Sequence, residues 1–363
     1  MTDHTLFYLH QAAADPTRTL TLRARFSADW ERRVNALKRV VLKSVVEMDC
    51  FGLNPPSKRV FVQAELTPTQ PRQFAYQWSA QKVEEFMKWL QDMESKGLLE
   101  TIEKPGTLAT GEEPWSNMYV YSSYQKGLSD TYARIRKSDP ELARLMELEP
   151  SFRPISGSVI QLVMQQPFHA DRLGLLYTRV FDQLKGVTAE MDKTISHVLT
   201  KGMADGLNPQ QIGKMLAEGM PDLHVGSPFK RAITRGRLIA RTEVIHAHAQ
   251  ASLNEYESIQ KAHGELILVE WVATKDTRTR PAHARLVDPH RGYDGLVMTQ
   301  GEARRRIGEP NCRCALAPYI PSIQGLPKKA TPAAIAEAKE MAKKNMKAKP
   351  HHSPLADDGE EEG

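Results

Sequence analysis

The sequence is poor in cysteine and has no long apolar segment. Only three of its 363 residues are cysteines, at positions 50, 312 and 314, which is too few for the disulfide framework of a small secreted protein. No run of about 18 apolar residues occurs, so no membrane-spanning helix is expected. The first 20 residues lack a basic segment followed by an apolar stretch, so no secretion signal is expected. These absences favour a protein that folds in a reducing compartment.

Common catalytic motifs and a strong charge bias are also missing. The sequence has no Walker phosphate-binding loop, no nucleophile elbow and no His-Glu-x-x-His metal motif. The formal net charge is +5, which permits contact with nucleic acid or an acidic partner but indicates neither. Hydrophobic residues make up 40% and charged residues 26%, a balance typical of a globular protein.

Helical periodicity is the main signal in the sequence. Apolar residues recur at three- and four-residue steps in several segments, and each pattern predicts an amphipathic helix with one buried face. Ser79 is expected to cap the second helix, and Asn208 to cap a later one together with Pro209 and Gln211. The predicted helices occupy residues 26–49, 79–97, 112–137, a long stretch from Ala170 whose stripe runs to Val198, 208–220 and 226–260.

The character of the sequence changes after Gly264. Residues 265–274 are rich in β-forming residues and predict a strand, and the end of residues 309–320 predicts a short second strand. The fold class is therefore predicted as mainly α with a small C-terminal α+β module, in which long helices precede a short β-rich, loop-rich domain. We divide the chain into an N-terminal helical region (1–150), a module of long helices with a small α+β end (151–320), and a low-complexity, largely disordered tail (321–363) with one helix in 332–347.

One candidate metal site combines His283, His290, Cys312 and Cys314. Zinc is bound by four Cys or His ligands, and a Cys-x-Cys pair can supply two of them. The usual zinc spacing has two or more residues between cysteines, so this spacing is unusual. Three interpretations remain open: a zinc site, a redox pair, and two small buried residues in a tight turn.

The predicted helix at 226–260 carries the sequence Ala-Arg-Thr-Glu at 240–243. Arg241 could donate two hydrogen bonds to a carboxylate, with Asp276 or Asp288 as the acceptor. We therefore expect Arg241 and Glu243 to hold the helix to the β module, and alanine at either position to lower stability. The predicted inward face of this helix contains Ile239, Thr242, His246, Ala249, Leu253 and Tyr256.

The loop after the first predicted strand suggests the alternative of an enzyme. Asp276, Arg278, Arg280 and His283 lie close together in sequence, as in many nuclease or phosphotransfer sites. A metal-dependent nuclease or hydrolase would use Asp276, His283 and His290. No complete catalytic constellation is present, so a protein without enzymatic activity is expected.

These motifs, in this order, resemble the phage head-morphogenesis family typified by the minor head protein of phage Mu (the MuF-like family). The resemblance covers about residues 170–319, and the N-terminal helices are similar only in general style. Where the chain has Thr279, Ala282 and Glu309, many family members have cysteines or histidine, which removes plausible metal ligands here. The positions that match the family are Arg241, Thr242, Glu243, Trp271, Asp276, Arg278, His283, Asn311, Cys312, Arg313 and Cys314. We expect the structural core of the module to consist of Arg241, Thr242, Glu243, His246, Trp271, Asp276, Arg278, Asn311 and Arg313.

The resemblance implies a minor capsid protein of a tailed phage. Such a protein is a structural and interaction protein in the capsid interior, present in few copies near the portal. Its implied partners are the portal protein, other capsid or scaffold proteins and viral DNA, which some members accompany into the host. The implied location is the virion, with assembly in the host cytoplasm and no requirement for a membrane. A basic stripe on the first helix could face DNA or an acidic portal surface: Arg23, Arg25, Arg32, Arg33, Lys38, Arg39 and Lys43.

Overall fold

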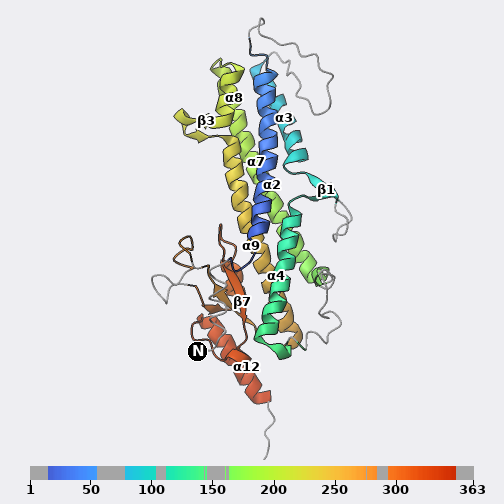
Figure 1. The fold of residues 1–363 in the computed structure, drawn as a ribbon, viewed down its shortest axis with the longest axis vertical. Coiled ribbons are helices and arrows are strands. Elements are labelled where there is room, and N and C mark those ends of the chain that lie inside the picture. The colour runs from blue at the N-terminus through green and yellow to red at the C-terminus, as the bar shows by residue number, and fades with distance from the viewer. Residues whose placement is uncertain are drawn as a thin grey trace, which may run out of the picture.

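A computed structural model shows a long helical bundle with a small sheet beside its lower half (Figure 1). It describes residues 15–54, 78–103, 112–142, 144, 160, 163–274, 276–283 and 293–348. The predicted fold class, mainly α with a small C-terminal α+β module, is confirmed. The bundle consists of α2 (Leu20–Leu42) with a π-helical turn η1 (Lys43–Glu47), α3 (Ser79–Gly97), α4 (Asn117–Ser138), α7 (Pro167–Ala204), α8 (Pro209–Glu218) and α9 (Pro228–His263).

The helix ends follow the sequence signals at Asn208 but not at Ser79. The Asn208 side chain accepts a hydrogen bond from the backbone N–H of Gln211, and the Asn208 N–H donates to the Gln211 side chain, both at 3.0 Å. At α3 the prediction is wrong, because Ser79 is the first helical residue. The cap position belongs to Trp78, whose side chain makes no capping hydrogen bond. The predicted stripe of α7, from Leu173 to Val198, is buried as expected.

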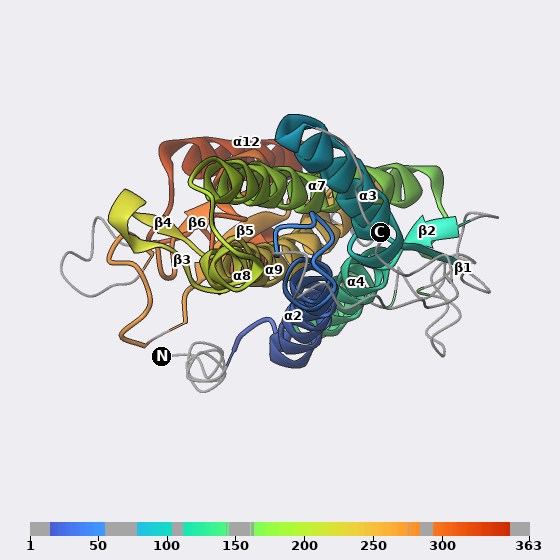
Figure 2. The same ribbon diagram turned by 90° about the horizontal axis from the view of Figure 1, so that it is seen from above.

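Helix α9 lies between α2, α4 and α7 (Figure 2). Its predicted inward face is buried, but so are residues on its other sides, including Val244, Ile245 and Ala247. A helix is buried on several sides when other elements surround it. The neighbours of α9 thus explain why its buried surface is wider than one stripe.

Close packing of α4 on α9 depends on Gly127. A β-carbon at this position would lie 2.4 Å from the backbone oxygen of His248 and 2.8 Å from the β-carbon of Ala251. Nearby, the Ser123 hydroxyl donates a hydrogen bond to the backbone oxygen of Val244. The two backbones therefore approach more closely than any side chain at position 127 would allow.

The C-terminal module is built on a three-stranded antiparallel sheet. The central strand β5 (Leu268–Val272) pairs with β6 (Val297–Met298) and β7 (Ala315–Tyr319), and Val272 lies opposite Ala315. Helix α10 (Gln300–Arg306) follows β6 with a capping box from Thr299 and Glu302. Both predicted strands of the module are thus present. Two further strand pairs lie in the helical body: β1 (Thr101–Glu103) with β2 (Glu112–Pro114), and β3 (Gly219–Met220) with β4 (Val225–Gly226), which flank the 3₁₀ turn η4 (Pro221–Leu223).

The segment after the sheet differs from the sequence prediction. It forms α11 (Pro321–Gln324) and α12 (Pro332–Ala348), of which only the second was expected. Before α12 the chain forms hydrogen bonds with β6, and Ala334 and Ala338 pack against Leu266 and Leu268. Small alanine side chains at four-residue spacing give α12 a flat face that the sheet covers. The prediction of a largely disordered tail is therefore wrong up to Ala348, and the rest of it lies outside the described residues.

Two hydrophobic cores meet along α9. The first joins α2, α3, α4, α7 and α8 to α9 as far as Ala251, and includes Ile239 and Val244. The second joins the sheet to the second half of α9 through Leu253 and Tyr256. The predicted boundary near residue 150 stays a prediction, although α4 and α7 on its two sides contribute to the same core.

A buried pair of carboxyl groups links α3 to α7. The Glu94 side chain is buried on α3, and it lies against Asp192 of α7. Burial, and then the charge and hydrogen bond of Asp192, raise the pKa of Glu94 to about 9. Burial likewise raises the pKa of Asp192. Glu94 is therefore protonated in the folded protein at neutral pH.

Glycine at position 127 can be tested against an exposed helical glycine. We expect Gly127→Ala to lower the free energy of unfolding by about 1–3 kcal/mol, because the new methyl group would overlap the α9 backbone. The matched control is Gly186→Ala on α7, where nothing lies within 4 Å of the new β-carbon. It should raise stability by about 0.5–1 kcal/mol. Urea unfolding followed by circular dichroism measures both, and equal stability of the two variants would contradict the close packing.

Stability should depend on pH through Glu94. The unfolded carboxyl ionises near pH 4.3 and the folded one near pH 9, so its stabilising contribution is complete below the first value and is lost as pH rises towards the second. We expect Glu94→Gln to be more stable than the unmodified protein at pH 8, by about 1 kcal/mol or more, and to differ little at pH 4. Urea titrations at both pH values measure this.

The control for that experiment is Glu84→Gln, at an exposed position of the same helix. It should show the pH dependence of the unmodified protein. If Glu94→Gln and Glu84→Gln had the same pH profile, Glu94 would not be held in its protonated form.

Candidate metal centre

The pairing of β5 with β7 brings His283 and the two C-terminal cysteines together. Because the strands are antiparallel, the loop that follows β5 lies next to the segment that precedes β7. His283 ends a turn in the first segment, and Cys312 and Cys314 stand directly before β7 in the second. The three residues are therefore placed by the sheet, although 29 positions separate His283 from Cys312.

The donor atoms of these three residues form a compact buried triangle. The Nδ1 atom of His283 lies 3.7 Å from the Sγ atom of Cys312 and 3.7 Å from that of Cys314. The ligand atoms all lie within 4.8 Å of one another, and no side chain of the three is more than 4% exposed. One imidazole and two thiols are a donor set that suits zinc. The same triangle would also fit a pair of thiols that hydrogen-bond to a histidine.

The orientation of His283 is fixed on its other side. Its Nε2 atom lies 3.4 Å from a carboxylate oxygen of Glu309, and Arg280 holds that carboxylate with an ion pair of 2.8 Å. The imidazole ring also packs edge-on against Trp271, with 5.3 Å between the ring centroids. Sequence reasoning treated Glu309 only as a missing ligand and gave Arg280 no role at the site. Arg280 and Glu309 can orient His283 only because the fold brings them together, since they are 29 positions apart in the sequence.

The two cysteines shift each other's pKa in opposite directions. Hydrogen bonding from Cys314 lowers the pKa of Cys312 to about 5. Burial opposes this change, and a smaller contribution from His283 adds to it. The pKa of Cys314 is raised, first by its hydrogen bond to Cys312 and then by burial. One thiolate is therefore available at neutral pH, and it is the more nucleophilic and metal-binding form of cysteine.

The partner of Asp276 is Arg313 and not Arg241. Asp276 accepts hydrogen bonds from both Nη atoms of Arg313 and from Arg278. These contacts, with that of Arg313 the largest, hold the pKa of Asp276 well below its usual range. Arg241 is exposed and forms no hydrogen bond or ion pair with the described residues. The prediction that Arg241 binds Asp276 is therefore wrong, and Asp288 lies outside the described residues.

Glu243 is buried, but it joins α9 to α7 and not to the β module. Its carboxylate accepts hydrogen bonds of 3.0 to 3.2 Å from Gln183 and Arg179, and His246 lies 3.6 Å away. Burial alone would raise its pKa, but His246 and then Arg179 outweigh that effect and lower it. The prediction that Glu243 holds α9 to the β module is therefore wrong.

Thr242 and Arg313 make the junction between α9 and the module. The Thr242 hydroxyl accepts a hydrogen bond of 3.1 Å from the backbone N–H of Asn311. Asn311 has a φ angle of 59°, a left-handed conformation that asparagine tolerates better than most residues. The backbone oxygen of Arg313 accepts a hydrogen bond from the Thr274 hydroxyl. The segment before β7 is thus fixed from both α9 and the end of β5.

The fourth predicted metal ligand, His290, lies outside the described residues, so its position relative to the triangle stays a prediction. Beside the triangle is a cavity of about 70 Å³. Asn311 and three arginines line it, together with Thr274, Thr279 and the donor side chains themselves.

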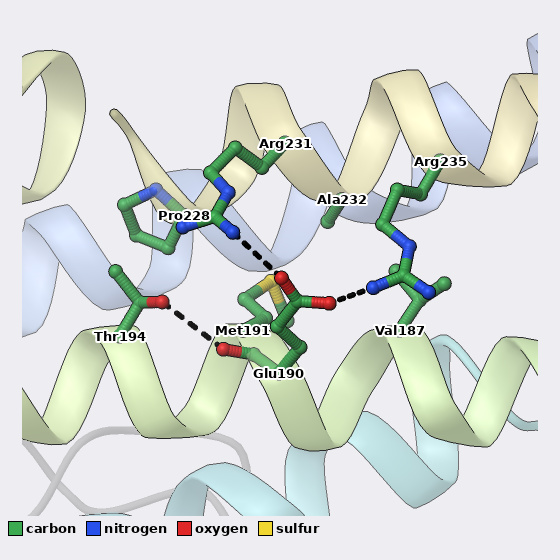
Figure 3. Close-up of a pocket in the computed structure, with 8 residues that line it drawn as sticks. All are labelled: Val187, Glu190, Met191, Thr194, Pro228, Arg231, Ala232 and Arg235. Atoms are coloured by element: carbon green, nitrogen blue, oxygen red, sulfur yellow. Dashed lines mark hydrogen bonds and ion pairs between the residues drawn. The ribbon is translucent and has the colours of Figure 1, made fainter. Parts of the chain in front are cut away.

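A second cavity lies between α7 and α9, as Figure 3 shows. Glu190 occupies it and forms ion pairs with Arg231 and Arg235, while Thr194 donates a hydrogen bond to the Glu190 backbone oxygen. Its volume is only about 10 Å³, which is close to that of one water. This cavity is a helix-to-helix ion-pair cluster, and the triangle is the stronger candidate for a functional site.

Comparison with known proteins gave one match. Residues 193–317 match the model of the family described as Phage Mu protein F like protein. The matched part runs from the second half of α7 to β7 and contains His283, Cys312 and Cys314. This confirms the resemblance to the phage head-morphogenesis family for these residues. Neither the search of curated proteins nor the search of solved structures found a match.

The different environments of Glu243 and Arg241 give a direct test. We expect Glu243→Ala to lower the free energy of unfolding by about 1–3 kcal/mol, because it leaves Arg179 and Gln183 without their acceptor. Arg241→Ala, two residues away on the same helix, should change it by no more than about 0.5 kcal/mol. Thermal and urea unfolding measure both variants. A large loss of stability in Arg241→Ala would indicate that Arg241 does hold α9 to the β module, as the sequence suggested.

Proposed function

We propose, from the match of residues 193–317 to the Phage Mu F-like family, that this protein is a minor capsid protein of a tailed phage. It acts as a structural and interaction protein in procapsid assembly, inside the head and near the portal. Its partners are the portal protein and other capsid or scaffold proteins, and viral DNA is a further contact during packaging or ejection. It assembles from the host cytoplasm into the virion. No described helix combines the length and the apolar character that a membrane crossing needs.

The exposed side of α2 supports a docking role for the helical body. Arg25, Arg32 and Arg39 are exposed at seven-residue spacing, so they lie on one stripe of the helix, and the exposed Lys43 extends it. Arg23 and Arg33 do not belong to this surface. Arg23 is buried against Asp15, and Arg33 binds Glu100 and the backbone oxygen of Gly97. The stripe is therefore narrower than predicted, and it suits an acidic protein surface or DNA phosphates.

The contacts of Asp276 weigh against the nuclease or hydrolase alternative. A general base must be free to accept a proton near neutral pH. Asp276 is held by Arg313 and Arg278 with a pKa well below its usual range, so it is a poor proton acceptor. Of the other two residues in that hypothesis, His283 faces two thiols, and His290 lies outside the described residues.

Affinity capture on the portal protein encoded by the same genome tests the proposed function. We expect the full chain to be retained at physiological salt, and the double variant Arg25→Glu/Arg39→Glu to reduce retention at least tenfold. The matched control is Lys193→Glu/Lys214→Glu, which makes the same change of charge at exposed positions on α7 and α8 and should be retained normally.

No retention of the unmodified chain would contradict portal docking. Incubation of the protein with plasmid and a divalent metal tests the nuclease alternative. Cleavage of the plasmid that is lost in Asp276→Ala would contradict a purely structural protein. A mobility-shift assay across a salt series reports the DNA contact, since phosphate binding weakens steeply as salt rises.

A further inference from the structure

We propose that His283, Cys312 and Cys314 bind one zinc ion through Nδ1 and two thiolates, and that a water in the adjoining cavity completes a tetrahedral site. This proposal does not depend on the function in the phage head. It also changes the ligand set that the sequence suggested, because it requires no contribution from His290. Three observations carry it: the dimensions of the triangle, the orientation of the imidazole, and the burial of the thiols beside a polar cavity.

The triangle has the dimensions of a tetrahedral zinc site. With Zn–S bonds of about 2.3 Å and Zn–N bonds of about 2.0 Å, the ligand atoms of a tetrahedron lie about 3.5–3.8 Å apart. The Nδ1 atom of His283 is 3.7 Å from each of the two Sγ atoms. The two Sγ atoms lie within 4.8 Å of each other, so the third edge of the triangle is also short enough for a shared ion.

Glu309 gives His283 the tautomer that zinc binding needs. The carboxylate lies 3.4 Å from Nε2 and so favours the tautomer with its hydrogen on that nitrogen, which leaves the lone pair of Nδ1 directed at the thiols. A carboxylate on the outer nitrogen of a ligating histidine is the usual outer-shell arrangement of zinc sites. Arg280 fixes the carboxylate in turn, through an ion pair of 2.8 Å. Glu309 is thus a positioning residue for the metal, although the resemblance to the phage family suggested only that a metal ligand is missing at this position.

A thiolate buried at this place needs a positive partner, which a metal ion supplies. The three side chains are almost fully enclosed, and an uncompensated thiolate in such a place is costly. Zinc binding requires both cysteines as thiolates, so the cysteine that still carries a proton releases it to solvent, and the ion then balances the charge of the two thiolates. The cavity of about 70 Å³ touches all three donors and exceeds the space one water requires. Asn311 and Thr274 on its wall offer the water hydrogen-bond partners.

Elemental analysis of the full chain, purified with zinc in the buffer and then desalted, tests the proposal. We expect one zinc per chain in the unmodified protein and in Cys50→Ala, which changes a buried cysteine of the helical body. Cys312→Ala, Cys314→Ala and His283→Ala should each contain less than about one tenth of that amount. Glu309→Gln keeps all three ligands and should weaken zinc affinity by about 10- to 100-fold.

Two further measurements decide the matter if the ligand variants fail to fold. The unmodified protein loaded with Co²⁺ should show thiolate-to-cobalt charge-transfer absorption, and its absence would overturn the proposal. Thiol titration after chelation and denaturation should find three free thiols; one free thiol would mean that Cys312 and Cys314 form a disulfide instead. Full metal content in Cys312→Ala and Cys314→Ala, or none in the unmodified protein, would likewise overturn the zinc site.

Discussion

The burial of the middle of α9, residues 242–256, on nearly all its sides is the constraint on which the rest of the structure depends. Helices α2, α4 and α7 and the β module cover this stretch. Polar side chains there have little access to water, so they need partners within the protein. Glu243 binds Arg179, His248 binds Asp130, and Asn254 donates to Tyr124. These pairs fix the neighbouring helices at set positions along α9, and so they also fix the sheet that continues from it.

The same constraint explains what sequence analysis could and could not predict. Regular spacing of apolar residues predicted each long helix, because one buried stripe is a local property of the chain. The motif at 241–243 misled because it was treated as one unit. Consecutive residues on a helix point about 100° apart, so Arg241 faces solvent, Thr242 faces the module and Glu243 faces α7. The polar residues of α9 can be identified from the sequence, but the helix or module that each side chain contacts cannot.

The candidate metal site was predicted in part for a similar reason. His283, Cys312 and Cys314 could be chosen from the sequence because cysteine is rare in it. The role of Arg313 needed the strand geometry: alternate residues of an extended segment point to opposite sides, so Arg313 turns away from the two thiols and reaches Asp276. Glu309 could not be assigned at all, because only the pairing of β5 with β7 brings it to His283. The packing of α12 was missed because an alanine-rich helix has little apolar contrast between its faces.

The arrangement connects the family match with a physical account of the protein. The matched residues contain α9 and the module built on it, whereas α2 and α4, which pack against α9, lie outside the match. A shared module held in a helical body of its own fits a protein that docks through surfaces, and the small cavity between α7 and α9 offers no room for a substrate.

Hydrogen–deuterium exchange under native conditions tests the central role of α9 most directly. If α9 joins the two cores, the amides of its second half and those of β5 should exchange slowly, at one common rate set by global unfolding, and mild urea should release them together with the amides of α7. Exchange of β5 through a separate, lower-energy opening while α9 and α7 stayed protected would show that the module is an independent unit, and would contradict the account.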